Sequence, residues 1–194
     1  MKQPSLPKLE TVSPVWTDYE LLDTGSGRKL ERFGAISLIR PEPQAVWSPS
    51  LPKESWNSAH AEFVQPDHRM QGTWQYSRPL PSRWKMRRQN LAFWVAPTPS
   101  GHLGVFPDQA CHWDWLAALI ASANTAPKIL SLFGYTGIAT LACASAGAHA
   151  THVDASRKAI KWARENQSLS QLEDRPIRWL VDDATSFVAR EIRR

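Results

Sequence analysis

The chain has 194 residues, of which 42% are hydrophobic and 21% charged, and this globular composition excludes a disordered or collagen-like protein. Its 23 Lys and Arg residues exceed its 18 Asp and Glu residues, and the net charge of +5 permits an anionic partner such as RNA without requiring one. Two cysteines cannot build a disulfide framework, and the sequence shows no zinc-binding spacing, no signal peptide and no membrane-length apolar run. We therefore expect a soluble cytoplasmic protein that binds neither metal nor membrane.

The N-terminal half is rich in Trp and Pro and poor in helical patterns. Residues 1–15 are predicted to form an extended, mobile arm because they carry three prolines. Residues 16–100 are predicted to form a small β-rich accessory region, with strands over 19–22, 29–40, 72–76 and 91–95. Gly25-Ser26-Gly27 supplies a turn after the first strand, and residues 48–60 are predicted to be a loop.

From Gln109 onward the hydrophobic period changes to that of helices. The first predicted helix carries apolar residues at helical spacing, namely Trp113, Leu116, Ala117, Ile120 and Ala121. Short apolar runs typical of buried parallel strands then alternate with helices, giving strands over 128–133, 149–154 and 177–181 and helices over 138–146, 156–166 and 184–192. This order predicts an α/β fold with a parallel sheet and right-handed crossovers.

A glycine turn follows the first of these parallel strands. Gly134 and Gly137 remove side chains between the strand and the next helix, so a ligand can approach backbone N–H groups there. Asp154 closes the second strand, and a carboxylate at this place can accept two hydrogen bonds from a ribose diol. Asp182 and Asp183 close the third strand at the same edge of the sheet.

The spacing of the glycines narrows the class of cofactor. A dinucleotide pyrophosphate needs the pattern G-x-G-x-x-G, whereas only G-x-x-G is present, so a dehydrogenase is disfavoured. A nucleoside cofactor without a pyrophosphate, such as S-adenosylmethionine (SAM), fits the pattern. The plain alternative is an α/β turn beside a surface aspartate, with Asp182 and Asp183 capping the helix that follows them.

Four segments resemble the class I SAM-dependent methyltransferases, and most closely the group that contains the 23S ribosomal RNA large-subunit methyltransferases: 132–137, 151–156, 162–166 and 177–184. Residues 104–109 resemble that family's loop leading into the cofactor site. The N-terminal half resembles the family's accessory β region only loosely. The resemblance implies that residues 101–194 form the N-terminal half of a Rossmann-like SAM-binding domain, comprising its first three β-α units.

The resemblance also implies a role for individual residues. The methionine end of SAM would lie against Phe133, Gly134, Tyr135, Thr136 and Gly137. Asp154 would hold the ribose, with Ser156 beside it. Asp183 and Ala184 would flank the adenine, and Gln109 would contact the cofactor from the upstream loop. The implied activity is transfer of a methyl group from SAM to RNA, with ribosomal RNA as the expected substrate.

The family continues after the third helix with a fourth strand and a D-P-P motif that meets the target base. This sequence ends at Arg194, so the resemblance implies that the catalytic residues lie in a missing C-terminal part and that the chain alone transfers little methyl. It also implies that the strand over 128–133, which is central in the family, forms an uncovered apolar edge. The alternative is a non-catalytic relic that binds SAM or serves as an interaction module.

A basic and aromatic cluster lies outside the methyltransferase-like region. Arg83, Trp84, Lys85, Arg87 and Arg88 can contact RNA phosphates and stack on bases. A solvated strand with alternating charges explains the same residues, so both interpretations stay open.

Overall fold

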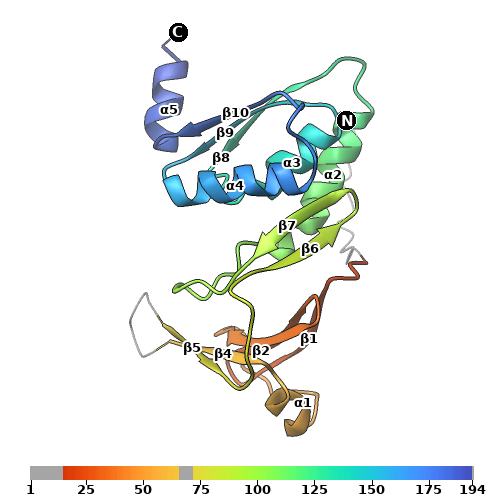
Figure 1. The fold of residues 1–194 in the computed structure, drawn as a ribbon, viewed down its shortest axis with the longest axis vertical. Coiled ribbons are helices and arrows are strands. Elements are labelled where there is room, and N and C mark those ends of the chain that lie inside the picture. The colour runs from red at the N-terminus through yellow and green to blue at the C-terminus, as the bar shows by residue number, and fades with distance from the viewer. Residues whose placement is uncertain (1–14, 66–71, 194) are drawn as a thin grey trace, which may run out of the picture.

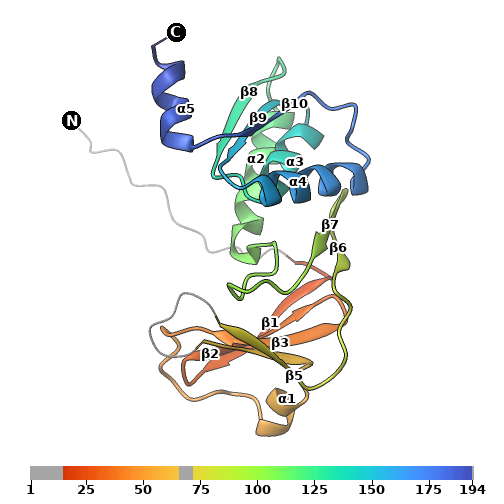
Figure 2. The same ribbon diagram turned by 60° about the vertical axis from the view of Figure 1, so that its left-hand side comes forward.

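The computed structural model describes residues 15–65 and 72–193. It has a β-rich N-terminal part and an α/β C-terminal part, and a two-stranded ribbon lies between them in both ribbon views (Figures 1 and 2). Of the arm predicted over residues 1–15, only Val15 falls within the described residues.

The N-terminal part is a five-stranded sheet with the spatial order β1-β2-β3-β4-β5. Its strands are β1 (Tyr19–Gly25), β2 (Arg28–Phe33), β3 (Ile36–Pro41), β4 (Ala61–Val64) and β5 (Thr73–Tyr76). The first three strands are antiparallel neighbours, and β4 is parallel to β3. The β-rich character that the composition indicated is therefore confirmed.

Two expectations for this part are wrong in detail. The segment predicted as one strand over 29–40 is a hairpin, because Gly34 takes a φ of 66° and the chain reverses between β2 and β3. The stretch predicted as a loop over 48–60 contains the short helix α1 (Lys53–Asn57), which buries Trp56.

The ribbon consists of the antiparallel strands β6 (Trp84–Arg88) and β7 (Leu91–Val95). On the side of the first sheet, Trp84 Nε1 donates a hydrogen bond to the carbonyl of Phe33 at 3.0 Å. On the other side, the amide of Trp94 donates to Asn166 Oδ1 at 2.8 Å. One buried hydrophobic cluster contains residues of both parts and of the ribbon, so the ribbon joins the two parts into one packed unit.

The C-terminal part contains a three-stranded parallel sheet with the order β10-β9-β8. A 3₁₀ turn (Pro107–Gln109) is followed by α2 (Ala110–Ala121), β8 (Lys128–Leu132), α3 (Ile138–Ser145), β9 (His149–Asp154), α4 (Arg157–Leu169), β10 (Ile177–Val181) and α5 (Ala184–Glu191). The helices α3 and α4 lie along one face of this sheet (Figure 1). The predicted α/β fold is confirmed, and β9 and β10 have the predicted bounds.

The strand β8 forms an edge of the sheet, as the resemblance implied. Ile129 packs against the cluster formed with α2 and α3. Leu130 and Leu132 are 50% and 36% exposed, so the expectation of a buried strand is wrong for these side chains. The reason is the alternation of side chains along β8, because Leu130 and Leu132 point to the face of the sheet opposite to Ile129 and to the helices α2 and α3 that Ile129 packs against.

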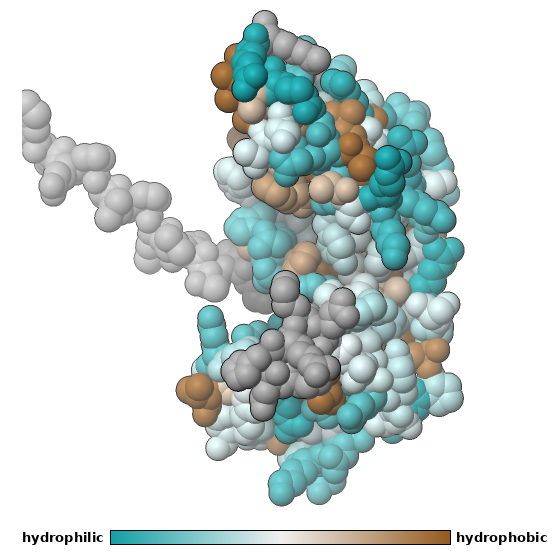
Figure 3. Space-filling model, turned by 90° about the vertical axis from the view of Figure 1, so that its left-hand side faces the viewer, coloured by the Kyte–Doolittle hydropathy of each residue, from teal (hydrophilic) through white to brown (hydrophobic). Residues whose placement is uncertain are grey.

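Apolar side chains reach the surface as separate patches among hydrophilic ones on the face that Figure 3 presents. Among the helices of the described residues, none combines the length and the apolar character that crossing a membrane requires.

Candidate functional site

The glycine turn after β8 is held by its own backbone. Phe133, Tyr135 and Gly137 have φ angles of 53°, 51° and 82°, so the chain enters the left-handed region repeatedly. The amide of Gly134 donates to the carbonyl of Val153 at 3.1 Å, and the amide of Gly137 donates to the carbonyl of Gly134 at 3.0 Å. The turn is therefore fixed to the neighbouring strand β9.

Gly134 is required because a histidine lies directly beneath it. A Cβ atom at residue 134 would stand 2.2 Å from His152 Cε1 and 2.5 Å from Nδ1, which no side chain can accept. His152 is fully buried, its Nδ1 shares a hydrogen bond with Thr140 Oγ1 at 2.8 Å, and its ring lies 4.6 Å from that of Trp179. Burial lowers the pKa of His152 to about 4, against an opposing influence of the Asp154 carboxylate, so the imidazole is neutral at physiological pH.

Asp154 connects the end of β9 to this turn. Its Oδ2 accepts a hydrogen bond from the amide of Tyr135 at 2.8 Å, and its Oδ1 accepts one from the amide of Ser156 at 2.8 Å. The structure thus brings the carboxylate and the glycine turn together, as their positions in the sequence indicated. Burial and the Asp154 carboxylate raise the pKa of Tyr135, so its hydroxyl stays protonated.

A cleft of about 250 Å³ opens between the turn, the start of α2 and the segment 104–106. Five residues from the predicted cofactor set line it: Gln109, Phe133, Gly134, Tyr135 and Thr136. The sequence interpretation missed Phe106 and His112, which also line the cleft. Phe106 lies within the segment 104–109, whose resemblance to the family's cofactor loop could have indicated it. In the structure its ring lies 5.7 Å from that of Tyr135.

The far wall of the cleft is tied to the rest of the molecule through Thr136 and Gly104. Thr136 Oγ1 donates to the carbonyl of Gly104 at 2.6 Å, and Asn166 Nδ2 donates to the carbonyl of Thr136 at 2.9 Å. Gly104 has a φ of 86°, and a Cβ there would meet the Trp162 ring at 2.4 Å. The fully buried Asn166 also binds the amide of Trp94, so it links the turn to the ribbon.

The five other predicted residues lie outside the cleft walls: Asp154, whose contacts with the turn are given above, and Gly137, Ser156, Asp183 and Ala184. Gly137 begins α3 and packs against α4, where a Cβ would stand 2.9 Å from Ala163 Cβ. Ser156 caps α4 through a bond from the amide of Ala159 at 3.2 Å. Asp183 caps α5 by accepting from the amide of Ser186 at 2.8 Å, which lowers the pKa of Asp183, and Ala184 is buried behind it.

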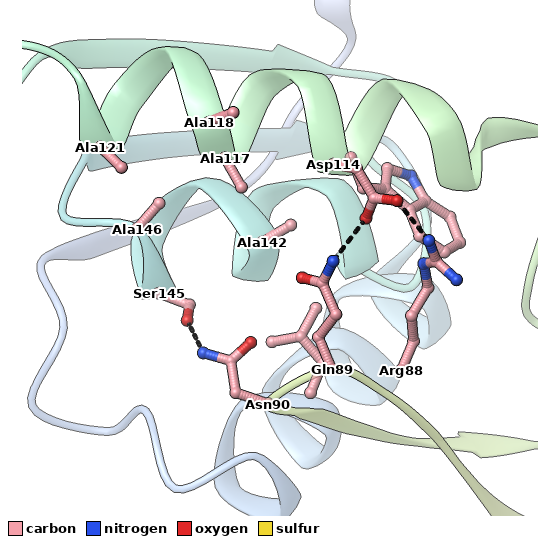
Figure 4. A pocket seen from close by; sticks show the side chains of 12 residues that line it. Arg88, Gln89, Asn90, Asp114, Ala117, Ala118, Ala121, Ala142, Ser145 and Ala146 are labelled. Carbon is pink, nitrogen blue, oxygen red and sulfur yellow. Dashed lines mark hydrogen bonds and ion pairs between the residues drawn. The ribbon is translucent and has the colours of Figure 1, made fainter. Parts of the chain in front are cut away.

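The basic cluster around β6 is divided between two environments. Arg83, Lys85 and Arg87 are exposed, whereas Arg88 is 6% exposed and binds Asp114 on α2, as Figure 4 shows. Trp84 is half-buried against the core and bonded to the first sheet. The interpretation of these two residues as contacts to RNA is therefore corrected, because alternation along β6 turns their side chains inward.

Comparisons with known proteins agree with this architecture, although no family model matches the sequence. The SAM-dependent methyltransferase from Agrobacterium tumefaciens is 44% identical with a TM-score of 0.88, over 93% of this chain and 57% of that chain. A Streptococcus mutans structure shares the fold with a TM-score of 0.72 at 17% identity, over 92% of this chain and 49% of that chain.

Among curated proteins, the ribosomal RNA large subunit methyltransferase K/L of Syntrophotalea carbinolica is 33% identical over 110 residues, which are 56% of this chain and 15% of that protein. The chain thus spans little more than half of the solved Agrobacterium relative and a small share of the curated one. The chain therefore shares the Rossmann-like fold of solved SAM-dependent methyltransferases. Within that class, the resemblance to the ribosomal RNA large-subunit group is confirmed.

Proposed function

We propose that this chain forms the SAM-binding part of a methyltransferase that acts on RNA, with ribosomal RNA as the substrate. The observation that carries the proposal is the cleft at the glycine turn, with Asp154 bonded to the Tyr135 amide at the neighbouring strand end. This edge, where parallel strands end, is where open α/β sheets bind nucleotide-like ligands.

The chemistry of the donor set fits SAM. Each Asp154 oxygen accepts one hydrogen bond from the protein, so each retains acceptor capacity for one hydroxyl of a ribose diol. The rings of Phe106, Phe133 and Tyr135 suit a positively charged sulfonium, because aromatic faces attract cations. Gln109 adds an amide at the start of α2, and Asp183 with Ala184 stands at the neighbouring strand end for the adenine.

When bound, SAM supplies an electrophilic methyl group on sulfur. The chain contributes orientation, because holding donor and acceptor in line removes most of the entropic cost of their encounter. The neutral His152 and the protonated Tyr135 add no charge to the turn, whereas the Asp154 carboxylate places a negative charge beside the Tyr135 amide.

RNA as the acceptor is supported by the curated relative, which is a ribosomal RNA methyltransferase, and by the net charge of +5. The excess of positive charge suits a polyanionic substrate.

Calorimetric titration of the chain with SAM tests the cofactor site. We expect the substitution Asp154→Asn to weaken SAM binding about 10-fold or more, since it removes a charged acceptor from a hydrogen-bonded pair. The matched control is Asp174→Asn, because Asp174 has an 80% exposed side chain and lies away from the turn. Equal affinity of the two variants, or no binding by the parent chain at millimolar SAM, would contradict the proposal.

A further inference from the structure

A strip of four cations runs along the exposed face of α4. Arg157, Lys158, Lys161 and Arg164 are all exposed, and none of them makes an ion pair with another described residue. Unpaired cations repel one another at helical spacing, so their clustering costs stability unless a polyanion compensates for it. We call these four residues the α4 basic strip.

The strip borders a shallow groove of about 560 Å³. Arg157, Lys161 and Arg164 line it together with Ile160 and Val181, and Val181 is 45% exposed at the end of β10. The groove therefore combines three cationic side chains with an apolar floor. Such a combination matches a ligand with anionic groups on one side and flat, weakly polar groups on the other.

The acids near the groove are already engaged. Glu165, the one carboxylate among the groove-lining residues of the described chain, accepts from Arg83 Nη1 at 2.7 Å. The Arg83 guanidinium also lies 4.3 Å from the centre of the Trp94 ring, which holds it in place. Beyond the groove, Asp182 pairs with Arg190, whereas Glu173 accepts from the neutral Ser168 Oγ at 2.5 Å and keeps its single negative charge against the four cations of the strip. The electrostatic field of the strip is consequently left positive.

The strip is long enough to follow part of a nucleic-acid backbone. Arg157 and Arg164 lie seven positions apart with Lys161 between them, which corresponds to about 10 Å at the rise of an α-helix. Each nucleotide contributes one phosphate charge to the backbone, so a strip of this length can contact more than one phosphate of the same strand. Arg157 lies three positions after Asp154, so the strip begins beside the candidate cofactor site.

The geometry points to the α4 basic strip and its groove as the surface that holds the phosphate backbone of the RNA substrate. This inference rests on the proposed function and deepens it by placing the substrate strand along α4 rather than along β6. The strip supplies the sequence-independent part of RNA binding, and the apolar floor formed by Ile160 and Val181 receives a ribose or base.

The test compares charge-reversal variants in an RNA-binding titration. The probe is a fluorescein-labelled oligouridylate of about 16 nucleotides, measured by anisotropy between about 50 and 200 mM KCl. We expect the double substitution Lys161→Glu/Arg164→Glu to weaken binding at least about 10-fold at the lower salt concentration. It should also make the slope of log K against log salt less steep by about 1.4, because two phosphate contacts are lost.

Two further variants control for net charge and for position. Lys128→Glu/Arg178→Glu makes the same change in charge near the amino ends of β8 and β10, whereas the groove lies at the carboxyl end of β10, and we expect it to bind the probe within about twofold of the parent chain. Lys85→Glu/Arg87→Glu tests the exposed face of β6. An equal loss in either control pair, or no loss in the α4 pair, would overturn the inference.

Two measurements distinguish this inference from the proposed function and from binding to a membrane surface. All variants are titrated with SAM, and we expect unchanged affinity because none of these residues lies in the cleft. SAM binding with no effect of the α4 pair on RNA overturns only the present inference, whereas absence of SAM binding by the parent chain overturns the proposed function. Sedimentation with phosphatidylserine vesicles covers the other polyanion: vesicle binding that depends on the α4 pair, without RNA binding, assigns the strip to a membrane surface and overturns the RNA assignment.

Discussion

Two aspartates show how differently the two parts of the molecule use a carboxylate. Asp23, beside an irregularity in β1, accepts four hydrogen bonds, from the amides of Thr24, Ser50 and Leu51 and from Trp56 Nε1, at 2.8–3.2 Å. Asp154 accepts two, both from backbone amides at 2.8 Å. Asp23 is 9% exposed, whereas Asp154 is half-buried. Asp23 is committed to the fold, and Asp154 keeps capacity for a ligand.

The pKa of Asp23 follows from the same contacts. Burial acts to raise it, but the hydrogen bonds from Leu51, Trp56, Ser50 and Thr24 together lower it below the usual range. Asp23 therefore remains ionised under mildly acidic conditions, and its contribution to stability is lost only as the pH falls through its lowered pKa.

The largest expected effect is the difference in stability between alanine variants of the two aspartates. Asp23→Ala leaves four donors without their acceptor and should lower the free energy of unfolding by about 4 kcal/mol, whereas Asp154→Ala should cost about 2 kcal/mol. Urea denaturation of both variants measures the difference. Equal losses would show that both carboxylates serve the fold to the same extent.

The pH dependence of stability also distinguishes the two parts of the molecule. The glycine turn that Asp154 contacts packs on His152, which is neutral in the folded protein. The folded-state pKa of His152 is about 4 and its ordinary value is 6.5, so the unfolded chain binds the proton more readily between these values. Stability should therefore fall by about 3 kcal/mol as the pH drops from about 6.5 to about 4. His152→Gln should flatten this dependence, and an unchanged slope in that variant would assign it to other groups.

A smaller effect tests why the turn needs its first glycine. Gly134→Ala should destabilise the protein by about 2 kcal/mol through the clash with the His152 ring. Gly27→Ala, where space is open but φ is 73°, should cost about 1 kcal/mol. In a double-mutant cycle, Gly134→Ala/His152→Ala should cost less than the sum of its single substitutions. Simple additivity would remove His152 as the reason for the glycine.

The α/β part could be predicted closely from the sequence, because its elements change hydrophobic period at clear breaks such as Pro127 and Gly147. The N-terminal part could not, since strand signals there are interrupted. β4 carries Glu62, whose carboxylate pairs with Arg28, and β6 carries Lys85 and Arg87 on its solvent face. Charged residues that pair across strands interrupt the alternation of apolar and polar residues from which a strand is predicted.

The site was predictable where chemistry is local and not where it depends on packing. The glycine turn and Asp154 follow from strand ends, which sequence patterns locate. The supporting residues His152 and Asn166 act through contacts with Gly134, Thr136 and Trp94 that come from other elements. No spacing rule marks such residues before the helices are packed on the sheet.

The bare margin of β8 carries a practical consequence. The backbone amides and carbonyls on its open side have no paired strand within the described chain, and the side chains of Leu130 and Leu132 are partly exposed. A surface of this kind templates the addition of any passing extended segment. We therefore expect the protein to self-associate through β8 at high concentration. The substitution Leu130→Lys should reduce this self-association, because a charge on an edge strand opposes pairing with another chain.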